Sequence, residues 1–167
     1  MTEPPPHPVH VLRLGLKHVS LGEFIRHDEL LLHSALIRET SVEERDDLAH
    51  GAEVSAVAED EVLLQEGVSA PRPALVLEGG VRLTLKDGMV DVAFLTKGDV
   101  FGLDALGLSE GTPAATGGPG GAKVAWLEVG RVRRLLSMHP ETATALEQAA
   151  EKRMNRANEG SDLFDRF

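Results

Sequence analysis

The sequence has 167 residues, which is enough for one domain with short extensions. Its formal net charge is −10 at pH 7, and an acidic chain without a basic face is a poor binder of nucleic acids. It contains no cysteine, which excludes disulfides, thiolate metal sites and a cysteine nucleophile. Hydrophobic residues make up 42 % but aromatic residues only 4 %, so the core must consist mainly of Val, Leu and Ala.

Residues 1–20 are predicted to form a proline-rich N-terminal arm, because the opening MTEPPPHPVH favours an extended polyproline conformation. Such an arm is typical of a disordered tail, although it could also be pinned to another surface. It has no basic region followed by an apolar run, so we expect no signal peptide. No apolar stretch reaches about 18 residues, so no membrane span is expected, and we expect a cytoplasmic protein.

Helices are predicted over residues 21–51, where the domain begins. Apolar residues recur at helical spacings over residues 21–40. A second helix is expected to start at Ser41, because Glu44 three residues later completes a capping box. Gly51 is expected to end that helix.

Residues 52–128 have the pattern of a β-roll or barrel, with short apolar runs separated by turn residues. The runs predict strands at 54–57, 62–64, 74–77, 81–85, 90–95 and 124–127. Asp87-Gly88 lies between two runs and indicates a hairpin. The glycine-rich stretch 117–121 is predicted to be a flexible loop without core residues.

Residues 129–157 are predicted to be helical again, with a tail over residues 158–167. A short helix is expected at 131–136, and Pro140 begins a longer one that should end at Gly160. A seam of small and apolar residues follows the longer helix at steps of three and four: Ala143, Leu146, Ala150 and Ala157. The seam could pack on its own domain or on a second copy of the chain.

Two further features of this half are expected to be structural. Trp126 lies on a predicted strand and is expected to be core or half-core, although tryptophan is also frequent in interfaces. Arg131, Arg133 and Arg134 are expected to form a solvated helix face that pairs with nearby acidic side chains.

Four motifs follow one another in the order EVLLQEG at 61–67, LVLEGGVRL at 75–83, KGDVFG at 97–102 and RLLSMHPE at 134–141. In this order and spacing, over about residues 30–157, they resemble the cyclic-nucleotide-binding domain of catabolite activators and protein-kinase regulatory subunits. The resemblance implies a mainly β fold, namely an eight-stranded β-roll or jelly roll with N-terminal helices and a long C-terminal helix. It also implies a regulatory role in signalling.

The resemblance places the ligand pocket in the segment that follows Phe101. In the family, this cassette binds the cyclic phosphate with backbone amides and an arginine, and a glutamate accepts the ribose hydroxyl. Here Leu103 stands at the glutamate position and Ala114 at the arginine position. Asp104 could replace the glutamate or cap the short helix, and we favour the cap. The candidate pocket residues are Gly102, Leu103, Asp104, Ala105, Leu106, Pro113, Ala114, Ala115 and Thr116.

The missing charges argue against ordinary cAMP or cGMP binding. A buried phosphate without its cation loses a charge-assisted hydrogen bond worth about 1.5–3 kcal/mol, and Asp104 would repel it further. No cation near the cassette replaces the arginine in the sequence. We therefore expect no cofactor.

The favoured hypothesis is a non-catalytic regulatory or scaffolding module that acts through protein–protein contacts. Its partner would be another protein, or a second copy in a homodimer, bound through the C-terminal helix. The candidate interface residues are Trp126, Ala143, Leu146, Ala150 and Ala157. The alternative is a signalling sensor that binds a cyclic nucleotide or another small ligand in a non-standard pocket.

Catalysis and DNA binding are not expected. All seven histidines lie outside residues 54–127, so the strands carry no histidine cluster for a metal, and no Gly-x-Ser-x-Gly motif occurs. Activator proteins continue beyond this fold into a helix-turn-helix, whereas the sequence given stops at Phe167, so we expect no DNA binding of that kind.

Overall fold

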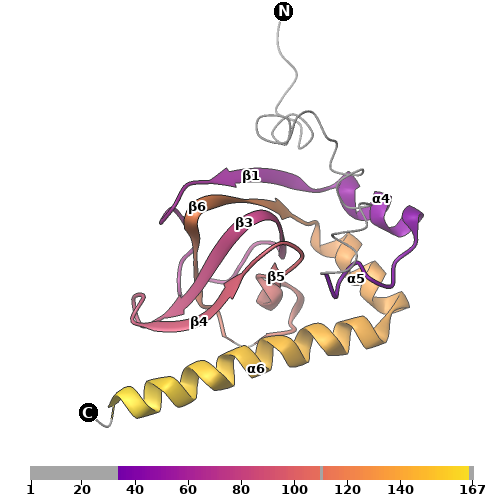
Figure 1. Ribbon diagram of the computed structural model, residues 1–167. Helices are drawn as coiled ribbons and strands as arrows, with labels where there is room; N and C mark the ends of the chain where they lie inside the picture. The colour runs from indigo at the N-terminus through magenta and orange to yellow at the C-terminus, as the bar shows by residue number, and fades with distance from the viewer. Residues whose placement is uncertain (1–33, 110, 166–167) are drawn as a thin grey trace, which may run out of the picture.

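The protein is described by a computed structural model that covers residues 34–109 and 111–165, with side chains as far as residue 159. The predicted arm at 1–20 and most of the first predicted helix lie outside the described residues. Figure 1 shows a curved sheet with short helices at one end and one long helix across its open side.

The helix α4 (Val42–His50) begins as the sequence predicts. The Ser41 side chain accepts from the Glu44 amide at 3.1 Å, and the Ser41 amide donates to the Glu44 carboxylate at 2.8 Å. This reciprocal pair is a capping box, which satisfies two amides that the first turn leaves free. Gly51 is the C-cap, so both predicted ends of the helix are confirmed.

All strand pairs of the sheet are antiparallel, and the strands follow the order β1-β6-β3-β4, with β2 paired to β6 and β5 paired to β3. The strands are β1 (Glu53–Val57), β2 (Val62–Leu64), β3 (Ala74–Leu85), β4 (Val90–Leu95), β5 (Val100–Phe101) and β6 (Ala114–Trp126). The mainly β class with flanking helices is therefore confirmed.

Six strands are present in the described chain where the resemblance implied eight, and the strands predicted at 74–77 and 81–85 are one strand. Strand β3 runs through Glu78-Gly79-Gly80, where its register with β6 shifts twice. Such irregularities bend a strand without ending it. The Asp87-Gly88 hairpin between β3 and β4 is confirmed, with Lys86, Asp87 and Gly88 all at positive φ.

The glycine-rich stretch 117–121 is not a loop: it lies inside β6, and the loop prediction is wrong. A Cβ on Gly117 would lie 2.1 Å from the carbonyl oxygen of Ala58, and one on Gly79 would lie 2.2 Å from that of Gly121. Only glycine lets these backbones approach so closely. At these two positions glycine is therefore required by the close approach of another backbone segment.

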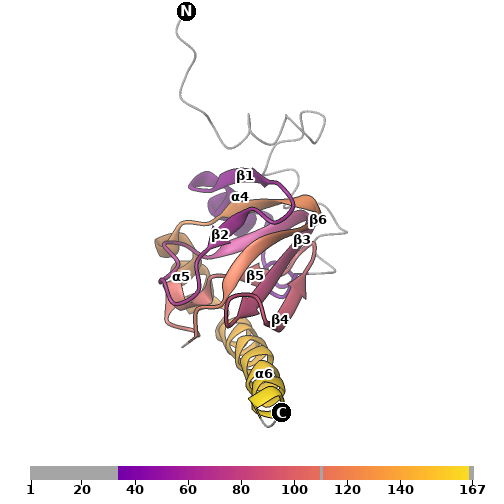
Figure 2. The same cartoon turned by 90° about the vertical axis from the view of Figure 1, so that its left-hand side faces the viewer.

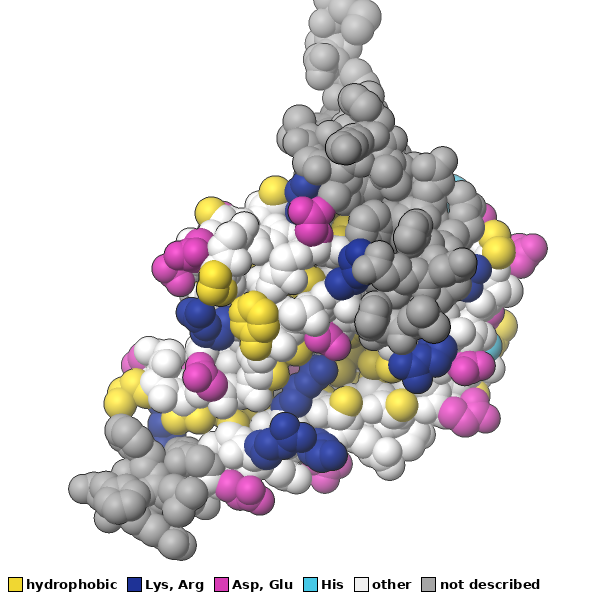
Figure 3. Space-filling model, viewed as in Figure 1, with side chains coloured by type: hydrophobic (Ala, Val, Ile, Leu, Met, Phe, Trp, Pro, Cys, Tyr) yellow, Lys and Arg dark blue, Asp and Glu magenta, His cyan; other side chains and the backbone are white. Residues whose placement is uncertain are grey.

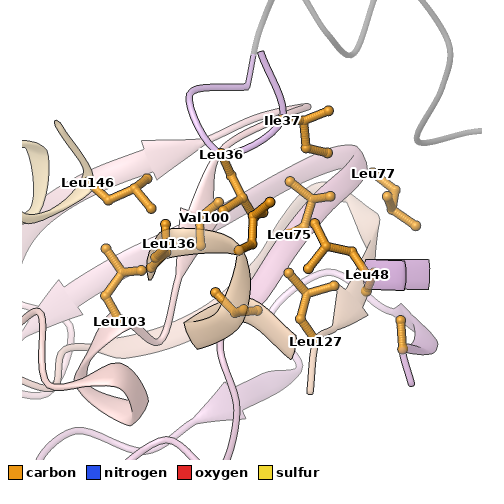
Figure 4. Close-up of a cluster of buried hydrophobic side chains, with 14 of the residues drawn as sticks. Leu36, Ile37, Leu48, Leu75, Leu77, Val100, Leu103, Leu127, Leu136 and Leu146 are labelled. Atoms are coloured by element: carbon orange, nitrogen blue, oxygen red, sulfur yellow. The ribbon is translucent and has the colours of Figure 1, made fainter. Parts of the chain in front are cut away.

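The core consists of two clusters on opposite faces of β3. Leu75 and Leu77 point to the cluster beneath the helices, while Ala74 and Val76 point into the roll. This alternation follows from the two-residue period of a strand. Figure 4 shows the first cluster, in which Leu36, Ile37, Leu48, Leu75, Leu77, Val100, Leu103, Leu127, Leu136 and Leu146 are labelled.

The C-terminal part forms two helices, α5 (Val129–Met138) and α6 (Pro140–Asp165). Helix α6 contacts α5 and β4, and Figures 1 and 2 show it running beneath the open side of the roll. It continues through Gly160, so the predicted end at that residue and the tail from residue 158 are wrong. A glycine costs a helix only about 1 kcal/mol relative to alanine and keeps its amide donor, so it weakens a helix without breaking it.

The short helices at the upper right of Figure 1 are joined by charged side chains. Arg131 of α5 pairs with Asp47 of α4 and with Glu128, and Arg134 pairs with Asp47 at 3.6 Å. This confirms for Arg131 and Arg134 the expected pairing with nearby acids. His139 lies 2.8 Å from the Glu44 carboxylate and ties the α5–α6 junction to α4.

Candidate functional site

A small cavity lies between the interior of the roll, the 3₁₀ helix η1 (Leu103–Leu106) and the inner face of α6. Its volume is about 40 Å³, which holds a few water molecules at most. Small-molecule sites usually measure roughly 300–1,000 Å³. The cavity is therefore closed to a ligand of ordinary size in this conformation.

The predicted pocket residues divide between the cavity and the core. Gly102, Leu103, Asp104 and Pro113 line the cavity. Ala105 and Leu106 pack against the two core clusters instead. Ala114, Ala115 and Thr116 form the start of β6, where Ala115 is completely buried. The structure thus brings four of the nine candidates into the cavity wall.

Asp104 does not cap η1 with its side chain, so the favoured capping interpretation is wrong. The Asp104 carboxylate accepts from the Ala70 amide at 2.8 Å and from the Thr112 hydroxyl at 3.4 Å. The N-cap position belongs to Gly102, which is in the left-handed conformation with φ 73°. Asp104 therefore fastens η1 to the segments before β3 and before β6.

A cation does reach the cavity, and it comes from α6. The side chain of Arg153 lines the cavity and is 25 % exposed. Its guanidinium lies 3.5 Å from the Val100 carbonyl oxygen and 4.0 Å from the Asp99 carboxylate. Burial lowers the pKa of Arg153 and the charge of Asp99 opposes this, yet an arginine keeps its charge in proteins. This arginine lies far from the cassette in the sequence, and the expectation concerned cations close to the cassette.

The helical seam held a signal for Arg153 that sequence analysis missed. Between Ala150 and Ala157, steps of three and four leave two positions that continue the seam, and these are Arg153 and Met154. A charged residue in the buried stripe of a helix needs a partner or a site. The sequence does not predict which surface of the domain this stripe of α6 packs against.

The seam packs on its own domain. Leu146, Ala150 and Ala157 are only 6 %, 8 % and 3 % exposed, and Ala143 packs against the first core cluster. Trp126 is half-buried and meets the Phe101 ring edge-on, with 5.7 Å between the ring centroids. In this conformation these five residues therefore do not offer an exposed interface.

A second, open hollow of about 580 Å³ lies beside the cavity, between the chain after η1 and α6. Ser109, Gly111, Ala150 and Met154 line both spaces. Met154 stands close to Gly111, where an added Cβ would lie 2.4 Å from the Met154 methyl group. Figure 3 shows Lys and Arg side chains gathered over the middle of α6, below a hollow with hydrophobic side chains.

Within residues 34–109 and 111–165, no group of three or more acidic or histidine side chains could hold a metal ion. In the same part of the chain, no helix combines the length and the hydropathy that crossing a membrane requires.

Solved structures with a similar fold include domains that are bound to cyclic nucleotides. The cAMP-bound PfPKA-R (141–441) matches with a TM-score of 0.67 and 22 % identity, over 83 % of this chain and 47 % of the other. The cAMP complex of the Toxoplasma gondii PKA regulatory domain gives 0.61 and 20 %, over 77 % and 50 %. The Thermus thermophilus catabolite activator protein gives 0.58 and 23 %, over 79 % and 63 %.

The chain therefore has the fold of a cyclic-nucleotide-binding domain. It spans about half the length of the two kinase regulatory structures that it matches. No protein-family model matches the sequence, and no curated protein is similar to it.

Proposed function

We propose that the protein is a non-catalytic regulatory domain that senses a small ligand in the cavity between α6 and the roll and signals through the position of that helix. The observation that carries the proposal is the composition of the cavity wall. Ala150, Arg153 and Met154 of α6 face Leu64, Leu83 and Phe101 of the roll across it. Any occupant must touch the helix, so occupancy and helix position are energetically linked.

The ligand is not expected to be cAMP or cGMP bound in the ordinary way. Leu103 cannot accept a hydrogen bond from a ribose hydroxyl, and Ala114 cannot donate one to a phosphate. The two kinase neighbours are bound to cAMP, but likeness at 20–22 % identity supports the shared fold rather than the shared ligand.

The second candidate is an adaptor that binds a protein and no small ligand. The volume of about 40 Å³ favours it, because the cavity is nearly filled by its own side chains. Its partner would dock on the outer face of α6, where Glu147, Gln148, Glu151, Lys152 and Asn155 are exposed.

A thermal-shift screen of the full chain against cAMP, cGMP, cyclic dinucleotides and a set of small organic metabolites tests the proposal. We expect no shift with cAMP or cGMP and at least one hit among the other compounds. A true hit should also slow amide exchange of α6 near residues 150–157. A screen without hits, together with a protein that co-purifies stoichiometrically, would instead establish the adaptor.

A further inference from the structure

We propose that the cavity binds a small carboxylate with an apolar body, that Arg153 binds the carboxylate, and that Met154 must swing aside to admit it. This inference rests on the proposed function and specifies the class of ligand. It depends on the lining of the cavity, on the long contacts of Arg153 and on the presence of Met154 in the lining of both spaces.

The body of the cavity is apolar. Leu64, Leu83, Val92 and Phe101 line it from the roll, and Leu103 lines it from η1. Of these, Leu83, Phe101 and Leu103 are no more than 5 % exposed. Such walls bind hydrocarbon or aromatic surface and give no hydrogen bonds to a sugar.

Among the described residues, Arg153 is the one cation in the lining, and its contacts are long. The distances of 3.5 Å to the Val100 carbonyl oxygen and 4.0 Å to the Asp99 carboxylate lie beyond ordinary hydrogen-bond lengths. A guanidinium has five N–H donors in a planar fork that matches a carboxylate in two parallel bonds. The fork thus has capacity for an anion at the mouth of an apolar space.

The surrounding charges favour a monoanion over a phosphate dianion. Asp99 faces Arg153, and Asp104 lines the same cavity. Two carboxylates near one guanidinium repel a dianion more strongly than a monoanion. The Asp104 carboxylate already accepts from Ala70 and Thr112, so it does not need a cationic ligand.

Met154 lines both the cavity and the larger hollow beside α6, together with Ser109, Gly111 and Ala150. Its side chain has three rotatable bonds, so it can change conformation at small cost. Moving it would enlarge the cavity of about 40 Å³ toward the hollow of about 580 Å³. The ligand would then enter from that side with its carboxylate at Arg153.

The test uses the full chain with Met154→Ala, which opens the cavity, and with Met154→Val as a milder version. Calorimetry measures the binding of benzoate, of the neutral isostere benzamide and of phenyl phosphate. We expect benzoate to bind at least tenfold more tightly than benzamide, with phenyl phosphate weaker than benzoate. Adding Arg153→Gln should weaken benzoate binding about ten- to hundredfold and leave benzamide within twofold. The matched control Arg156→Gln removes an exposed cation on the same helix and should change neither ligand.

Three other outcomes would contradict the inference, and each excludes a different part of it. Equal binding of benzoate and benzamide would remove the carboxylate as the ligand class but leave a sensing cavity, so the proposed function would stand. If phenyl phosphate or cAMP binds more tightly than benzoate, the ligand class is a phosphate ester and not a carboxylate. If neither aromatic probe binds to a folded Met154 variant, the cavity is not a site for apolar anions. The screen of the unaltered chain then decides separately whether it senses any ligand.

Discussion

Arg153 illustrates how one residue can serve both packing and recognition. Its aliphatic stem continues the buried stripe of α6, and its charged end meets Asp99 and the Val100 carbonyl at the cavity. Neither contact is short, so the charge is kept near the site without being fully satisfied there. A lysine at this position would keep the charge but lose the planar fork.

Gly117 gives the sharpest prediction at the scale of a single residue. We expect Gly117→Ala to lower the free energy of unfolding by about 1–3 kcal/mol or more, because the new methyl group would meet backbone that cannot rotate away. The contact is the carbonyl oxygen of Ala58, which would lie 2.1 Å from the added Cβ. Urea unfolding followed by circular dichroism measures the change.

Gly130 is the matched control for that substitution. It lies on α5, is exposed, and has nothing within 4 Å of an added Cβ. Gly130→Ala should therefore raise the free energy of unfolding, by up to about 1 kcal/mol. If Gly117→Ala proved as harmless as Gly130→Ala, the close approach of β6 to the chain after β1 would be incorrect.

At the scale of the elements, α4 is tied to the α5–α6 junction by Glu44. Its carboxylate accepts from the Ser41 amide and lies 2.8 Å from His139. The hydrogen bond from the Ser41 amide lowers the pKa of Glu44 below its ordinary value of 4.5, burial opposes this, and His139 adds to the lowering. A lowered pKa in the folded state means that the charged carboxylate stabilises the fold.

This contribution is present above the ordinary pKa of 4.5 and is lost as the pH falls through the lower folded value. Glu44→Gln should therefore reduce the free energy of unfolding more at pH 7 than at pH 3. Urea midpoints across this pH range measure the difference. The control is Glu43→Gln, at an exposed position of the same turn. It measures how the loss of one negative charge, without the contacts of Glu44, changes the free energy of unfolding. If the free energy of unfolding depends on pH in the same way for the unaltered chain and for Glu44→Gln, the Glu44 carboxylate does not stabilise the fold by its charge.

Sequence motifs of a few residues predicted those helix ends and turns that depend only on neighbouring residues. The capping box at Ser41 and Glu44 fixes the start of α4, and Asp87-Gly88 fixes the β3–β4 hairpin. The glycine-rich part of β6 was mistaken for a loop because glycine favours turns locally, whereas its cause is the approach of Ala58, which is distant in sequence. Arg153 was missed for the same reason: only the packing of α6 on the roll brings residue 153 to a cavity that begins at Leu64.

At the scale of the whole molecule, α6 is held unequally along its length. Leu146 and Ala150 belong to the first core cluster, and Ala143 packs against it. Among the described side chains after Met154, as far as residue 159, only Ala157 is buried. Because fewer of the described side chains are buried after Met154, we expect changes at the cavity to affect this lighter end of α6 most.

Distances between spin labels can test this inequality, because the chain has no cysteine of its own and only engineered ones will react. One labelled pair joins Ala56→Cys on β1 to Glu159→Cys, near the less buried end of α6. The second pair joins Ala56→Cys to Glu147→Cys, near the more buried end. All three positions are exposed. Arg153→Gln removes the contacts at Asp99 and Val100 and should broaden the 56–159 distance distribution while leaving the 56–147 distribution unchanged. Broadening of both would mean that α6 loosens as one body, and then the cavity could not bias its far end alone. If neither distance distribution broadens, the contacts of Arg153 with Asp99 and Val100 do not hold α6 in place. The guanidinium could then bind a ligand without loosening the helix.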